Sequence, residues 1–225
     1  MLIRYLLFLL LGIPHSVSAQ QDELLRQALQ RMYGTVLTQH HWLRRQGELT
    51  GCSIEYRLLI QDWAYSQGRP VVVTGAIGLH TNDRAGAVVG LKVVALDQHR
   101  QGGNVVSVPN APHFAYLENA SNVNNADAMV GSDAGDTPGG RVFAFNFFAD
   151  SQIEITKSIM DNKIRLLFNR KEGGGDIRVP IDLTVLDTGD DGARKHGMET
   201  LEQFRQCASE FLSQVQAKME RSSRK

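Results

Sequence analysis

The two cysteines, Cys52 and Cys207, are the residues of this chain whose chemistry is simplest to predict. They are the only cysteines among 225 residues, and no Cys-x-x-Cys motif is present, which argues against a dithiol redox centre. In an oxidising compartment the simplest product is one intramolecular disulfide. Two buried free thiols and a bond to another chain are the alternatives. We predict the structural disulfide.

A stretch rich in asparagine, aspartate and glycine, residues 118–141, contains the candidate metal ligands. Carboxylate and amide oxygens are the ligands that calcium prefers. The candidates are Asn122, Asn124, Asp127, Asp133 and Asp136. No Asp-x-Asp-x-Asp-Gly spacing accompanies them, and the same residue types are typical of a solvated mobile loop. The mobile loop is the favoured interpretation, with a metal site as the alternative.

Two aromatic residues, Trp63 and Tyr65, are the candidate ligand-binding side chains. If they continue a strand, their rings share one face and could stack on a ligand. Packing in the core or at its rim is the more common role of such a pair. The sequence contains no Gly-x-Ser-x-Gly, His-Glu-x-x-His, phosphate-loop or dinucleotide-binding motif. We therefore assign no catalytic residue and expect no cofactor.

Hydrophobic periodicity predicts a β-rich middle between two helices. Helical spacing predicts helices over 22–45 and 198–219, while alternation with a period of two predicts strands between 52 and 186. Turn signals recur about every ten residues, as in antiparallel folds. The expected fold is α+β: an antiparallel β-sandwich or barrel-like sheet with an N-terminal and a C-terminal helix packed on it. One domain, 20–225, includes all of these elements.

Three shorter segments of this pattern carry specific predictions. Alternation at Ile153 and Ile155 places them among the strands. Pro180 predicts an edge strand or a strand with a bulge, because proline cannot donate to a ladder. The polar segment 187–197 is expected to be a linker. Cys207 lies beside the apolar stripe of the last helix, so a disulfide would attach that helix to the first strand at Cys52.

The first nineteen residues have the layout of a secretory signal peptide. One basic residue, Arg4, precedes an apolar run, Tyr5 to Ile13, and small residues end at Ala19. A membrane span needs about 20 apolar residues, more than this run supplies. We expect cleavage after Ala19, no integral membrane anchor in the mature chain, and export to the periplasm, or alternatively to the extracellular medium.

The charge balance narrows the class of partner. The sequence has 24 basic and 24 acidic residues without a basic cluster, which argues against nucleic acid as a partner. The leading hypothesis is an exported, non-enzymatic accessory or binding subunit of a cell-envelope assembly, with envelope proteins as partners. The alternatives are a secreted hydrolase with a non-motif active site and a small-ligand carrier that uses a barrel interior. No oligomeric state follows from the sequence.

Overall fold

The computed structural model describes residues 15–82, 86–102 and 104–222 of the chain. Its elements are, in order, α1 (His15–Met32), β1 (Gly34–Arg45), β2 (Glu48–Asp62), β3 (Arg69–Asn82), β4 (Gly86–Gln101), β5 (Asn104–Pro109), β6 (Phe114–Asn119), η1 (Ala126–Ala128), β7 (Met129–Ala134), β8 (Gly140–Asn146), α2 (Asp150–Met160), β9 (Ile164–Asn169), β10 (Ile177–Ile181), β11 (Val185–Thr188), β12 (Arg194–His196) and α3 (Glu199–Ser222). Strands predominate and all pairings between them are antiparallel.

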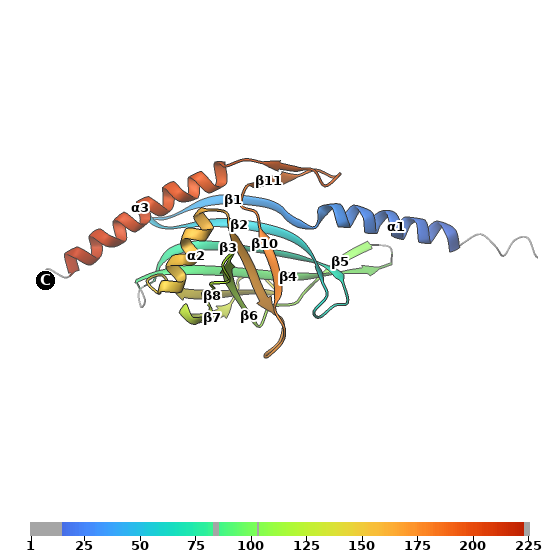
Figure 1. Ribbon diagram of the computed structural model, residues 1–225, viewed down its shortest axis with the longest axis horizontal. Coiled ribbons are helices and arrows are strands. Elements are labelled where there is room, and N and C mark those ends of the chain that lie inside the picture. The colour runs from blue at the N-terminus through green and yellow to red at the C-terminus, as the bar shows by residue number, and fades with distance from the viewer. Residues whose placement is uncertain (1–14, 83–85, 103, 223–225) are drawn as a thin grey trace, which may run out of the picture.

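The main sheet has the order β1-β2-β3-β4-β8-β7, with β5 paired to the distal half of β4. A second sheet, β10-β9-β6, lies in front of it together with α2, whereas α1 and α3 project at opposite ends (Figure 1). The predicted sandwich is confirmed, but the sheets do not close into a barrel. The alternative of a small-ligand carrier assumed a closed barrel interior, which the sheets of the described residues do not form.

The core lies between the two layers. Alternate residues of β2, β3 and β4 face it, and α3 adds a buried apolar stripe. The largest fully buried side chains are Phe143, Phe145, Phe168, Phe204 and Phe211. Burial of one such ring stabilises the fold by roughly 1.5–3 kcal/mol. Because phenylalanines from both layers and from α3 belong to one buried cluster, the sheets and the last helix share a hydrophobic core.

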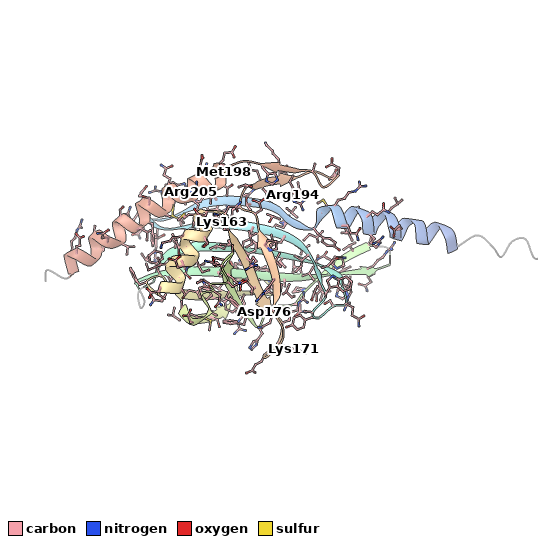
Figure 2. The ribbon with its side chains drawn as sticks, viewed as in Figure 1. Lys163, Lys171, Asp176, Arg194, Met198 and Arg205 are labelled. Atoms are coloured by element: carbon pink, nitrogen blue, oxygen red, sulfur yellow. A yellow bond between two sulfur atoms is a disulfide. The ribbon has the colours of Figure 1, made fainter. Side chains whose placement is uncertain are left out.

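The disulfide between Cys52 and Cys207 is confirmed, and both residues are fully buried. It joins β2 to α3 across 155 residues, as the sequence predicted. Arginines make further connections: Arg194 donates to the carbonyl of Thr35, and Arg205 donates to the carbonyl of Met160 at the end of α2. Both arginines are labelled in Figure 2. These hydrogen bonds connect strand β12 to β1 and helix α3 to α2.

The predicted helix 22–45 is wrong beyond residue 32. The helix α1 ends at Met32, Gly34 adopts a φ of +110°, and residues 34–45 form β1. A tight turn at Gln46 and Gly47, both with positive φ, pairs β1 with β2 along its length. This long-range pairing outweighs the helical spacing of apolar residues. The expected cleavage point after Ala19 falls within α1, and residues 1–14 of the expected leader lie outside the described part.

Three shorter segments also differ from expectation. Residues 150–160 form α2 because its buried side chains recur at helical spacing: Gln152, Ile155, Thr156 and Ile159. The supposed linker 187–197 contains β12 and the end of β11, which pair as a hairpin. The supposed loop 118–141 contains the end of β6, the turn η1, β7 and the start of β8. Pro180 does lie on an edge strand, since β10 ends the second sheet.

Candidate functional site

The aromatic pair lies in the turn between β2 and β3, so the predicted shared strand face is wrong. Trp63 is 73% exposed and its ring lies against Gly68. The Tyr65 hydroxyl donates to the carbonyl of Gly175 at 2.5 Å, and its backbone N–H donates to Asp62 at 2.9 Å. Tyr65 therefore connects the β2–β3 turn to the segment before β10, a role within its own fold.

The five candidate metal ligands are distributed over separate contacts. Asn122 accepts a hydrogen bond from Arg165, Asn124 from the N–H of Ala126, Asp127 from Ser151 and Asp136 from Lys92, while Asp133 lies exposed in β7. In the described residues, no three histidine, cysteine or acidic side chains form a group that could hold a metal ion. The structure does not bring these candidates together.

The asparagine that orders this segment is one that sequence reasoning missed. Asn125 is fully buried; its Oδ1 accepts from the N–H of Leu117 at 2.8 Å, and its Nδ2 donates to Gln152 at 2.7 Å. These bonds attach the segment to β6 and α2. Buried polar groups that are hydrogen-bonded on both sides specify one conformation. Nothing in the local sequence separates Asn125 from its exposed neighbours.

The cluster nearest to a hydrolase triad is Asp182, Thr184 and His196. The Thr184 hydroxyl donates to Asp182 Oδ1 at 2.6 Å, and both Thr184 Oγ1 and Asp182 Oδ2 approach the same ring nitrogen, His196 Nδ1, at 3.0 and 3.7 Å. A catalytic triad needs the nucleophile and the carboxylate on opposite imidazole nitrogens. The cluster stabilises the turn between β10 and β11 instead.

Asp182 provides a pH-dependent prediction. Burial raises its pKa, but hydrogen bonds from Thr184 and Asn162 lower it more, so the net pKa lies below its usual value. An unfolded aspartate titrates near pH ~3.9, so the carboxylate contributes full stability above that pH and loses it as pH falls through the folded pKa. In thermal denaturation at pH 7, Asp182→Asn should have a lower melting temperature than wild type. The loss in free energy of unfolding should be less than about 1 kcal/mol, because solvent screens this partly exposed carboxylate. A gap that stays constant down to pH 3 would contradict this role.

A buried ion cluster joins the two layers near the β2–β3 turn. Arg170, directly after β9, contacts Asp97 at 2.6 Å and Asp62 at 3.3 Å. Its side chain is 4% exposed and that of Asp62 is fully buried. Asp97 also accepts from Asn110. The single cation of Arg170 lies between two carboxylates within the fold, and periodicity did not single out these residues.

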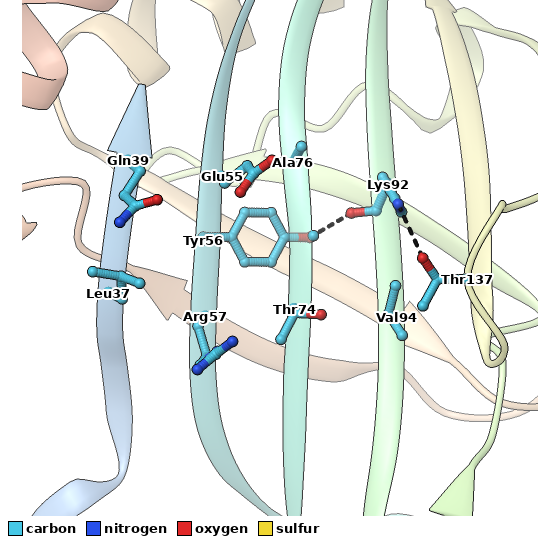
Figure 3. Close-up of a pocket in the computed structure, with 11 residues that line it drawn as sticks. Leu37, Gln39, Glu55, Tyr56, Arg57, Thr74, Ala76, Lys92, Val94 and Thr137 are labelled. Atoms are coloured by element: carbon cyan, nitrogen blue, oxygen red, sulfur yellow. Dashed lines mark hydrogen bonds between the residues drawn. The ribbon is translucent and has the colours of Figure 1, made fainter. Parts of the chain in front are cut away.

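Two pockets are shallow. One, of about 220 Å³, lies on the face of the main sheet away from the second sheet, and its charged lining side chains are Glu55, Arg57 and Lys92 (Figure 3). Lys92 is held by Asp136 at 2.5 Å. Beneath the pocket, Tyr56 donates to the carbonyl of Lys92, and a Cβ on Gly75 would lie 1.9 Å from that oxygen. The second pocket, about 420 Å³, lies between the start of β1 and the β9–β10 edge.

The two ends of the main sheet differ in how they are covered. At the β1 end, β11 runs along the strand (Figure 1): Thr38 donates to the carbonyl of Val185 at 2.7 Å, and Thr188 donates to that of Val36. At the other end β7 pairs with β8 on one side, and no strand of the described residues pairs with its second side. We call this second side the free edge of β7. All six residues of the strand β7 are exposed.

Exposed apolar side chains lie at the start of this strand. Met129 is 38% exposed, Val130 is 54% exposed, and Phe148, just after β8, is 46% exposed. The short strand β5 is also exposed throughout and contains three exposed valines, Val105, Val106 and Val108. Clustered exposed apolar residues are typical of interaction surfaces. The candidate functional site is the free edge of β7 together with exposed Met129, Val130 and Phe148; the valines of β5 lie along a different part of β4.

Comparison with known proteins adds no relative: no family model, curated protein or solved structure matches the chain. Among the described residues, no helix is long and apolar enough to cross a membrane. The function must therefore be argued from the disulfide-bonded sandwich and its exposed strands.

Proposed function

We propose that this protein is an exported, non-enzymatic accessory subunit that binds another protein of the cell envelope through the free edge of β7. The observation that carries the proposal is the exposure of all six residues of β7 at an uncovered end of the main sheet. An exposed edge strand presents unpaired backbone N–H and C=O groups to other chains. At the opposite end of the sheet, β11 packs against β1.

Export to the periplasm is supported by the leader-like sequence of residues 1–19 and by the disulfide. Disulfides persist in oxidising compartments such as the bacterial periplasm. The bond between Cys52 and Cys207 is buried and closes a segment of 155 residues, which suits a structural role.

A binding role accounts for the arrangement of polar side chains better than a hydrolytic one. The most buried charged side chains, Asp62 and Arg170, face each other, and Glu118 lies 3.1 Å from Arg165. The cluster around His196 lacks triad geometry. The secreted hydrolase is therefore the weaker alternative.

Site-specific photo-crosslinking in living cells tests the proposed subunit role. A photoreactive residue replaces Val130 beside the free edge, and in a matched control it replaces Gln206 on the exposed face of α3. We expect a discrete adduct with an envelope protein from position 130 and none from position 206. Folded protein that forms no adduct from position 130, or the same adducts from both positions, would contradict the proposal.

A further inference from the structure

We infer that the partner contributes an extended strand that adds to the free edge of β7, with apolar residues facing its start and basic residues facing its end. This inference rests on the proposed function and names the chemistry of the partner. Its basis is the combination of backbone geometry, exposed apolar side chains and charge along one strand.

Most of β7 pairs with β8 in a regular register. The pairing with β8 shifts register between Met129 and Gly131, so Val130 is an inserted residue. From Gly131 to Ala134 the pairing is regular, opposite Ala144 to Arg141. In a strand, backbone groups alternate between the two sides, so those directed away from β8 remain available. An extended peptide satisfies such groups by strand addition, which a helix or a loop cannot do.

Exposed apolar side chains lie at the start of β7. Val130 is exposed at the register shift, and Met129 lies opposite Phe145, three residues before exposed Phe148. A hydrogen bond of 2.7 Å from Ser151 to Asp127 holds the start of α2 against the turn that leads into β7. Phe148 lies two residues before α2, whose start is held at this turn. Figure 1 shows α2 and β7 at the same end of the molecule. A partner strand would bury apolar side chains against this end.

Carboxylate side chains lie at and just beyond the other end of β7. Asp133 is exposed in β7, and Asp136 follows three residues later with 82% of its side chain exposed. Hydrogen bonds from Lys92 and Thr137 lower the pKa of Asp136, so it remains ionised. Two cations lie near this end: Lys92 forms an ion pair with Asp136 at 2.5 Å, and Arg141 donates to the carbonyl of His113 and to Ser132. Among the described residues Asp133 forms no ion pair, so lysine or arginine on the partner strand would complement Asp133.

Peptide binding to the full-length, disulfide-bonded protein tests the inference. The probes are two labelled peptides of about ten residues. Each peptide has one half in which valine alternates with threonine and one half in which lysine alternates with threonine. The valine half comes first in one peptide and second in the other. We expect one order to bind in fluorescence anisotropy. The same peptide with alternate backbone amides methylated should bind at least about tenfold more weakly, because it cannot form the strand ladder.

Two charge-reversal variants test whether the carboxylate of Asp133 contributes to peptide binding. Asp133→Lys should weaken binding of the unmethylated peptide at least about tenfold, whereas Glu172→Lys, the same charge change in the exposed turn after β9, should leave binding unchanged. Circular dichroism verifies that both variants are folded.

Three results would overturn the inference: binding of neither peptide, equal binding of the methylated peptide, or no effect of Asp133→Lys. An adduct from position 130 in cells together with failed peptide binding would reject strand addition and retain the subunit role. Peptide binding without any adduct in cells would reject the envelope role and retain the strand-binding edge.

Discussion

Replacement of Cys52 and Cys207 by alanine is expected to lower the free energy of unfolding by about 2–5 kcal/mol. The bond closes a loop of 155 residues, and loop entropy alone assigns roughly 5 kcal/mol to a closure of that length. Both residues are also fully buried, where β2 meets α3. The measurement is urea denaturation of the purified double variant beside the oxidised wild type.

The loss should be traceable to the last helix. Wild type treated with a reductant should match the double variant, and Ser209→Ala, an exposed change on α3, should leave stability unchanged. In hydrogen exchange, amides of α3 should lose protection before those of the central strand β3. A decrease below about 1 kcal/mol would mean that packing of α3 against the sheet, and not the bond, holds the helix in place.

Replacement of Arg170 by methionine is expected to cost about 3–5 kcal/mol of stability. Arg170 is 4% exposed and supplies the cation for Asp62, which is fully buried, and for Asp97. Methionine retains much of the side-chain volume, so the loss reports the charge that is left uncompensated and not a cavity. Thermal and urea denaturation at pH 7 measure it.

An exposed ion pair and a compensating variant test whether the loss comes from the buried, uncompensated charge. Lys157→Met removes the cation of a pair with Glu154 on α2, where both side chains are more than half exposed, and should cost less than about 0.5 kcal/mol. Adding Asp62→Asn and Asp97→Asn to Arg170→Met should recover part of the loss, because no charge then stays buried. Equal costs for Arg170→Met and Lys157→Met would show that the buried cluster contributes no more than a surface pair.

Local periodicity was sufficient where a strand has one buried face. In β2, Ile54, Tyr56 and Leu58 face the core and alternate with exposed Glu55 and Arg57, so the period of two is present in the sequence. The same holds for β10, including the placement of Pro180 at an edge. The disulfide was equally predictable, because a chain with only two cysteines has one intramolecular pairing.

Segments defined by distant contacts were not predictable in this way. The strand β1 continues an apparently helical pattern, and its identity depends on pairing with β2 and on the carbonyls of Leu183 and Val185, to which Thr38 donates. The strand β7 looks like a polar loop because all six residues are exposed and no apolar alternation marks it. Its strand conformation comes from the pairing with β8.

The candidate site was predicted only in part. Asp133 and Asp136 were noted as oxygen donors for a metal, but the structure separates them from the other candidates and makes Asp133 an exposed residue of β7. Exposed Val130 and Phe148 had no distinguishing signal. Which edge of a sheet stays uncovered depends on the order of the strands, a property that no local window of residues contains.

The sequence by itself therefore determined the β-rich class, the central strands, the C-terminal helix and the single disulfide, because each follows from local alternation, helical spacing or cysteine count. Only the tertiary structure decided that β1 is a strand, that Asp62, Asp97 and Arg170 meet, and that β7 ends the main sheet. The physical reason is that backbone pairing and buried charge compensation are long-range interactions. Their partners lie outside the local window, from 7 residues apart for Ala134 and Arg141 to 108 residues apart for Asp62 and Arg170, and are brought together by folding.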